Sequence, residues 1–354
     1  MAPLSQSYPD AVRRPALSIR MGGGLGPTAS AAGEDPWQRS TRSIMSRCAL
    51  APHVDLALIA LSNDAQAPAV AVDDAGEIAL GYEDAETTLV FTATVDKIYL
   101  TIHGFQCIET ANGSSALGRF RINQSYEKQS AGDIVSDLAS QAGVQTDAVE
   151  SGVDLPFYVV DDRRSAWEQI AQLARMSGFA AYFTVEDKLC FKALAQGQPA
   201  QTFTYGLDIL AFQASQSPGP ALTFAVVGEG AAGSQGEEAW SWLIKDPSSV
   251  TAEAGGGPIR KVISSPALRS SQSAQTAADG LAAETQQKVN IGRIITPGAP
   301  AVVVGSTIEV ADLPADELNG VGLVTRVIHE FSKTSGFISR IDFYKPGNGG
   351  GGVP

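Results

Sequence analysis

Residues 161–192 constrain the fold most, because they carry clear start and stop signals for a helix followed by a hairpin. Ser165 followed three residues later by Glu168 is the capping-box pattern that begins a helix. Gly178 stands where helices commonly end in a left-handed residue, and residues 179–191 read as two short strands around a polar turn. The apolar stripe of this helix comprises Trp167, Ile170, Ala171 and Ala174. We predict a helix packed on a β-hairpin, a unit that indicates no function by itself.

Most of the remaining chain alternates apolar and polar residues, as half-buried strands do. Between residues 44 and 102 short strands alternate with turn signals, which favours a small antiparallel barrel or sandwich. The fold class that follows is α+β, mostly antiparallel β. The predicted strands are 16–21, 54–61, 77–82, 87–98, 99–105, 201–205, 209–215, 222–228, 291–296, 302–310, 321–331 and 337–344.

Two more helices are predicted. A second capping box, Ser130 with Asp133, begins one helix, which Gly143 can end. The other covers residues 270–290 and is rich in Ala and Gln, with a weakly hydrophobic face that suits close packing. Before it, residues 229–258 are polar and glycine-rich, with Trp240 and Trp242 as their large aromatic residues.

Composition excludes several classes of function. The 354 residues carry a formal net charge of −13, so nucleic-acid binding or attachment to an anionic membrane is not expected. We find no signal peptide in the N-terminal residues and no apolar run long enough to span a membrane. Cys48, Cys107 and Cys190 are scattered and odd in number, which indicates reduced cysteines in a cytosolic setting.

The residues that carry chemistry form no recognisable constellation. The three histidines, His53, His103 and His329, are far apart without metal-ligand spacing, and each is read as structural. The glycine-rich residues 22–26 lack the G-K-[ST] ending of a phosphate loop, and there is no G-x-S-x-G elbow. The acidic doublets Asp73-Asp74, Asp161-Asp162 and Glu186-Asp187 fall at predicted turns or before a helix. We therefore predict no catalytic, cofactor-binding or metal-binding residues, no cofactor, and a structural or binding role instead of an enzyme.

Four segments, taken in order, resemble the phage late control protein D family of baseplate hub proteins. Residues 77–98 resemble its strand-turn-strand, with Ala93 where glycine is common, and residues 126–143 resemble its first helix. Residues 157–191 resemble its helix followed by a strand pair, with Ala166-Trp167 in place of the usual Phe-Leu.

The fourth segment, residues 271–345, resembles the family's C-terminal block. It has an Ala-rich helix, then a strand pair within 298–310, a segment 320–331 that places His329 on the family's histidine, and a closing strand after 336–337. The order and spacing of the four segments carry the resemblance. Residues 1–40 and 229–258 are not covered by it.

The resemblance implies a fold with two similar small β-barrels and an α+β middle domain. We accordingly expect a weakly patterned N-terminal segment (1–40), a first barrel (41–112), a middle domain (113–196), a second barrel (197–228 with 291–345), an insert with a polar loop and an Ala-rich helix (229–290), and a disordered tail (346–354).

The resemblance also implies a function. Hubs of this family are homotrimeric symmetry adaptors in contractile phage tails or phage-like contractile injection systems, and they are related to the base of type VI secretion (VgrG) spikes. The expected partners are an inner tube protein hexamer, a separate spike protein and other baseplate components. Assembly would take place in the bacterial cytoplasm. The net charge further suggests an acidic channel lining.

Two alternatives stay open at this point. One is a receptor- or glycan-binding β module, which would present an exposed aromatic platform. The other is a tail-associated cell-wall hydrolase, which would need a carboxylate pair or a zinc site.

Overall fold

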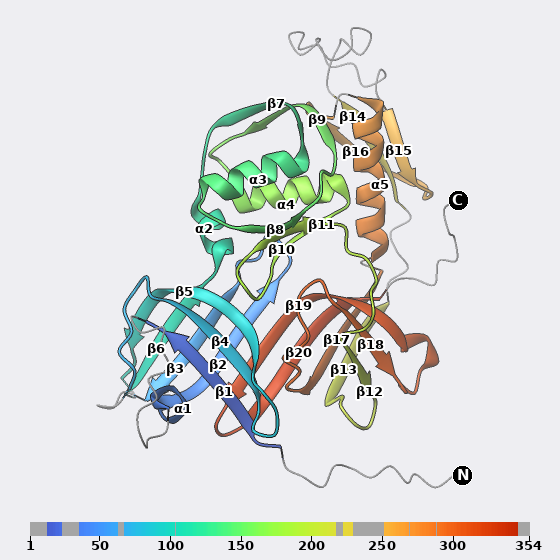
Figure 1. Cartoon of the computed structure of the whole chain (residues 1–354). Helices are drawn as coiled ribbons and strands as arrows, with labels where there is room; N and C mark the ends of the chain where they lie inside the picture. Colours follow the sequence, from blue (N-terminus) through green and yellow to red (C-terminus); the bar gives the residue numbers. More distant parts are fainter. Residues whose placement is uncertain are drawn as a thin grey trace.

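The computed structural model describes residues 13–22, 35–62, 67–102, 104–216, 222–228, 251–268, 270–287 and 289–345. His103, Trp240, Trp242 and the predicted tail 346–354 lie outside the described residues. Figure 1 shows two parts, a broad curved sheet at the bottom and a mixed helical and stranded part above it. We call them the sheet body and the α+β body.

The sheet body is one 12-stranded sheet. Hydrogen bonds join its strands in the order β1-β4-β5-β6-β3-β2-β19-β20-β17-β13, and β18 pairs with both β19 and β12. Neighbouring strands are antiparallel except for the parallel pair β12 and β18. The strands are β1 (Pro15–Met21), β2 (Thr41–Ala49), β3 (Leu56–Ser62), β4 (Ala75–Tyr82), β5 (Thr88–Leu100), β6 (Phe105–Ala111), β12 (Gln201–Thr204), β13 (Ala211–Gln216), β17 (Asn290–Pro297), β18 (Thr307–Ala311), β19 (Gly320–Ser332) and β20 (Gly336–Tyr344), with the short helices α1 (Pro36–Ser40) and η2 (Asp316–Leu318) beside them.

The sheet body buries one face of its strands in two cores. Along β20, burial alternates residue by residue, as a strand with one covered face requires. The first core lies among β1 to β6 and the second among β12, β13 and β17 to β20. Phe331 and Phe337 of the β19–β20 hairpin fill part of the first core, although both strands otherwise enclose the second.

The resemblance implied two separate barrels, and the described residues form neither of them as a closed barrel. The two strand sets are instead joined into one open sheet by pairing of β2 with β19. The cause is the length of β19. Its first residues pair with β18, and residues 326–332 extend beyond β18 to pair with β2.

The α+β body confirms the helix and hairpin predicted for residues 161–192. Helix α4 has both hydrogen bonds of the Ser165–Glu168 capping box and ends at Gly178 with a φ of 69°. Helix α3 has the second capping box, from Ser130 and Asp133. The elements of this body are α2 (Gly113–Arg119), β7 (Gln124–Ser130), α3 (Ala131–Gln141), β8 (Thr146–Val149), β9 (Asp154–Val160), α4 (Ala166–Ser177), β10 (Ala180–Phe183), β11 (Leu189–Lys192), β14 (Leu222–Gly228), β15 (Thr251–Gly255), β16 (Ile259–Ser265) and α5 (Ser271–Gln287).

Strand β14 differs from its predicted grouping with residues 291–345. It pairs with β15 and β16 in a separate three-stranded sheet. Phe224 and Val226 belong to the core of the α+β body, together with the small buried residues of α5. The sequence shows a good strand here, but its partners β15 and β16 lie in or beside a segment read as a polar loop.

The chain connects the two bodies repeatedly. It leaves the sheet body after β6, returns before β12, leaves again after β13 and returns before β17. Backbone hydrogen bonds add to these connections, such as the one from the Ala51 amide to the Ala181 carbonyl at 2.8 Å.

The sheet body contains an internal repeat. Strands β2, β3, β4, β5 and β6 pair in the order β2-β3-β6-β5-β4. Strands β13, β17, β18, β19 and β20 follow each other in the same chain order and pair as β13-β17-β20-β19-β18. Every one of these pairs is antiparallel, so the same five-strand unit occurs twice in one chain.

The two units agree residue by residue at an irregular position. The β5–β6 register shifts between Val95 and Lys97, and the β19–β20 register shifts between Val324 and Arg326. Lys97 lies opposite Glu109 just after the first bulge, and Arg326 lies opposite Asp342 just after the second. Because a bulge fixes the local register and twist, this agreement aligns residues 94–102 with 323–331 without ambiguity.

Candidate interaction surface

The face of the sheet opposite the two cores is a candidate interaction surface. Its side chains are the half-buried or exposed partners of the inward residues on β5, β6, β3, β2, β19, β20, β17 and β13. Apolar residues such as Leu58, Met45 and Ile328 alternate across it with charged ones. The charged residues on these eight strands are six basic (Arg42, Arg47, Lys97, Arg293, Arg326 and Arg340) and four acidic (Asp96, Glu109, Glu330 and Asp342).

Ion pairs fix the charged side chains of β17, β19 and β20 on this face. Asp342 on the central strand accepts hydrogen bonds from Arg293 at 2.5 Å and from the Nε of Arg326 at 2.7 Å. Partial burial opposes ionisation of Asp342, but the two guanidinium groups outweigh it and hold its pKa below the usual value. Arg340 and Glu330 form a third pair at 3.0 Å. The surface is thus mixed in charge.

Exposed apolar residues gather at two ends of the sheet body. One group, Tyr99, Leu100, Ile102 and Phe105, lies where β5 turns into β6. The other, Tyr205, Leu207 and Leu210, lies between β12 and β13. Figure 1 shows β5 and β6 at one side of the sheet body and β12 and β13 at the other. Exposed groups of this kind commonly mark contacts with other chains.

The two described histidines have different surroundings. His329 is buried beneath Phe337, and its Nδ1 lies 2.8 Å from the Ser339 hydroxyl. Burial lowers the pKa of His329 to about 4, so its ring is neutral near pH 7. His53 is exposed, and its carbonyl accepts a hydrogen bond from the Trp167 indole at 2.9 Å. The thiols of Cys48, Cys107 and Cys190 are free.

A buried carboxylate that the sequence reading missed, Asp55, lies at the joint between the two bodies. Its side chain accepts hydrogen bonds from the Ala49 amide at 2.8 Å and from Asn112 at 3.1 Å. Asp187, from one of the acidic doublets, accepts a hydrogen bond from the Gly113 amide at 2.7 Å, where the chain enters the α+β body after β6. Burial raises the pKa of Asp55 to about 7 and that of Asp187 to about 6. Backbone and amide groups satisfy both carboxylates, so we assign them to the joint and to no reaction.

We expect the stability difference between the protein and its Asp55→Asn variant to depend on pH. The folded carboxyl group keeps its proton up to about pH 7, whereas the unfolded chain releases it near 3.8. Between these values the folded state binds more protons, so the contribution is complete below the ordinary pKa and is lost as the pH rises through about 7. The slope reaches at most about 1.4 kcal/mol per pH unit.

Urea unfolding of both proteins between about pH 5 and 8 measures this difference. Asp161→Asn, in the loop before α4, is the matched control and should give a flat difference, because hydrogen bonds from Arg163 lower the pKa of this carboxyl group in the folded state. A flat difference for Asp55→Asn as well would contradict the assignment of a raised pKa.

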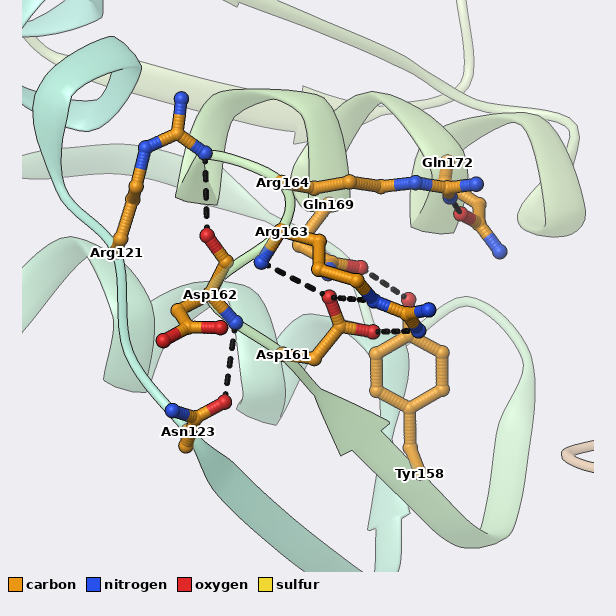
Figure 2. A network of polar contacts seen from close by, with 9 residues as sticks. All are labelled: Arg121, Asn123, Tyr158, Asp161, Asp162, Arg163, Arg164, Gln169 and Gln172. Atoms are coloured by element: carbon orange, nitrogen blue, oxygen red, sulfur yellow. Dashed lines mark hydrogen bonds and ion pairs between the residues drawn. The ribbon is translucent and has the colours of Figure 1, made fainter.

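The doublet Asp161-Asp162 belongs to the loop that leads into α4 (Figure 2). Asp161 accepts hydrogen bonds from the backbone and side chain of Arg163, at 3.0 Å and 2.7 Å. The backbone amide of Asp162 donates to Asn123 at 3.1 Å, and its carbonyl accepts from Arg121 at 3.4 Å. These contacts shape the loop, and they do not bring two carboxylates together for catalysis.

The described ranges contain no group of three His, Cys, Asp or Glu side chains arranged to hold a metal ion. None of the helices described there combines the length and the hydropathy needed to cross a membrane. A cleft of about 480 Å³ lies between α4, α5 and the end of the sheet body, and Arg175 and Glu284 close part of it by an ion pair at 3.0 Å.

Solved structures show which proteins share this fold. The 43 kDa tail protein of prophage MuSo2 from Shewanella oneidensis is 13% identical with a TM-score of 0.68, covering 94% of this chain and 98% of that one. The tail protein from Neisseria meningitidis MC58 is 11% identical with a TM-score of 0.68, covering 94% and 97%.

A third likeness comes from a secretion system. The E. coli c3393 protein is 11% identical with a TM-score of 0.60, covering 95% of this chain and 79% of that one. It is described as a component of the type VI secretion system, structurally similar to the T4 bacteriophage tail proteins gp27 and gp5. At these identities the likenesses establish the fold, which is one found in phage tail proteins and in a type VI secretion component.

Sequence comparisons add less. The chain matches none of the curated proteins with which it was compared. A family described as "Alg8 N-terminal domain" matches residues 67–218, less than half of the chain. That segment is not a structural unit here, because β6, β12 and β13 pair with strands β3, β18 and β17 outside it.

Proposed function

We propose that the chain is a structural hub protein of a contractile phage tail or of a phage-like contractile injection system. The observation that carries the proposal is the five-strand unit that occurs twice in the sheet body, with its bulge at the same place. The shared fold with tail proteins and with a type VI secretion component supports the same conclusion. In this proposal each unit with its own core is one of the two barrel-like domains of a hub.

The proposed assembly is a homotrimer that acts as a symmetry adaptor. Three chains with two equivalent units each present six units around a threefold axis. Such a ring matches a hexameric inner tube on one side and a trimeric spike on the other. The partners are therefore an inner tube protein, a separate spike protein and further baseplate components.

We assign the channel of this ring to the sheet face opposite the cores. The other face is filled by the two cores, so it cannot face an open channel. The eight strands of the assigned wall carry six basic and four acidic residues, the set named above. This assignment does not support the acidic lining that the net charge suggested.

The mass of the native particle, alone and with tube and spike proteins, tests the proposal. We expect a particle of three times the chain mass of 36.9 kDa that binds both partners. The alternatives make different predictions. A stable monomer that binds neither partner would overturn the hub function, and clearing of peptidoglycan in a zymogram would support a hydrolase instead.

A further inference from the structure

The junction between the two repeat units inside one chain has a defined register. Residues 326–332 of β19 extend past β18 and pair antiparallel with β2, from Arg326 opposite Ala49 to Ser332 opposite Ser43. His329 lies opposite Ser46, and Phe331 lies opposite Ile44. The end of one unit is thereby added to the first strand of the other.

The same two elements occur a second time without this pairing. Strand β5 is the counterpart of β19, and β4 pairs with it only as far as Thr94. Strand β13 is the counterpart of β2 and ends the sheet, with β17 as its sole partner among the described strands. Residues 97–102 and 211–216 thus present two open edges, which lie at opposite sides of the sheet body (Figure 1).

We infer that residues 97–102 of one copy pair antiparallel with β13 of a neighbouring copy, in the register of the β19–β2 junction. The inference rests on the proposed trimer and deepens it. The bulge aligns Leu100 with His329 and Ile102 with Phe331. Strands β3 and β17 hold the same place in the two units, and their pairing aligns β2 with β13, so that Ala214 corresponds to Ser46 and Phe212 corresponds to Ile44. Leu100 therefore lies opposite Ala214 of the next copy, and Ile102 lies opposite Phe212.

The side chains at the edge of β5 fit this pairing. Phe331 belongs to the core of the neighbouring unit, His329 is buried beneath Phe337, and the two are 5% and 4% exposed. Their counterparts Leu100 and Ile102 are 66% and 96% exposed in the single chain. Pairing with β13 covers both, which removes a large apolar surface from water.

The receiving edge fits as well. Residues 211–215 are Ala, Phe, Gln, Ala and Ser, without the charges or proline that usually protect an open edge strand. A cavity of about 130 Å³ beside β13 is lined in part by Phe212, Ala214, Leu318 and Phe343. An apolar side chain opposite Ala214 would lie beside this cavity, in the place that His329 takes opposite Ser46. Three such junctions close three open sheets into one ring.

Cysteine cross-linking tests the register. In a chain whose three cysteines are replaced by serine, and whose native mass is measured first, Leu100→Cys and Ala214→Cys are placed on separate, co-expressed chains. Directly opposed residues in an antiparallel pair are about 4.5–5.5 Å apart at Cα, within the range a disulfide spans. We expect a covalent dimer from the mixture and a covalent trimer when both cysteines are on every chain.

A one-residue slip provides the matched control. Gln213→Cys in place of Ala214→Cys points to the other face of the sheet, so it should not cross-link with Leu100→Cys. A trimer that cross-links only at the slipped position, or at neither, overturns this inference and leaves the hub function standing. A particle that is monomeric before any cysteine is added overturns both.

A second variant tests the interface by mass. Ile102→Asp places a charge in the proposed junction while changing an exposed residue of the single chain. We expect circular dichroism to show that the variant is folded. We expect the measured mass to show at least a tenfold weaker self-association. A trimer of unchanged affinity would also overturn the inference.

Discussion

Replacing Trp167 by alanine should lower the free energy of unfolding by about 3–5 kcal/mol, the range for large-to-small changes in a core. Trp167 is 1% exposed in the core of the α+β body and packs on Phe183 with ring centroids 5.4 Å apart. Its indole also donates to the His53 carbonyl at 2.9 Å. The substitution therefore removes packing inside the α+β body and a hydrogen bond to the β2–β3 loop of the sheet body.

Urea unfolding measures the change, and Trp167→Phe separates the two contributions. Phenylalanine keeps most of the packing but leaves the His53 carbonyl without its partner, which should cost about 1–3 kcal/mol. A loss below about 1 kcal/mol for Trp167→Ala would place the side chain outside the core.

Replacing Gly280 by valine should lower the free energy of unfolding by about 1–3 kcal/mol, as overpacking does. Helix α5 crosses the end of α4 at this residue. A Cβ atom on Gly280 would lie 2.7 Å from the Gly178 amide nitrogen and 3.0 Å from the Arg175 carbonyl oxygen. These are backbone atoms of a helix end, so they cannot rotate away.

Ala283→Val is the matched control, because Ala283 is an exposed residue of the same helix. It carries the helix-propensity cost of valine without the clash and should change stability by less than about 0.7 kcal/mol. Equal effects of the two substitutions would mean that α5 does not need the close approach to α4.

The elements that sequence predicted well are those whose signals are local. The capping boxes at Ser130 and Ser165 and the glycine at 178 each act within a few residues, so both helices begin or end as expected. Strands β7, β9 and β16 were not predicted, and β15 lies in the segment 229–258 that was read as polar loop. In β7, Gln124–Ser130, the segment QSYEKQS has one buried aromatic residue, Tyr126, and no clear alternation.

The pairing of β2 with β19 has no local signal at all. Two strands that are distant along the chain meet because β19 is longer than its neighbour β18. The repeat is equally hidden, because inward positions only need to be apolar and outward positions are free to vary. Lys97 with Glu109 and Arg326 with Asp342 correspond in charge, but only the paired bulges reveal it.

The open edge at residues 97–102 could not be predicted from the sequence for the same reason. Leu100 and Ile102 look like ordinary strand residues in the sequence, and their exposure follows from where β4 stops pairing. Asp55 was missed because a single aspartate before a strand does not indicate that its side chain is buried. Its environment comes from Asn112 and Asp187, which other elements bring to it.

The repeated passage of the chain between the two bodies has a mechanical consequence. A force that pulls the α+β body away from the sheet body acts on four covalent connections together, after β6, before β12, after β13 and before β17. Each connection then carries a share of the tension, so the two bodies cannot be separated by extending one connection alone. A particle that fires by sudden contraction would gain from a component that transmits load in this way without coming apart at a single hinge.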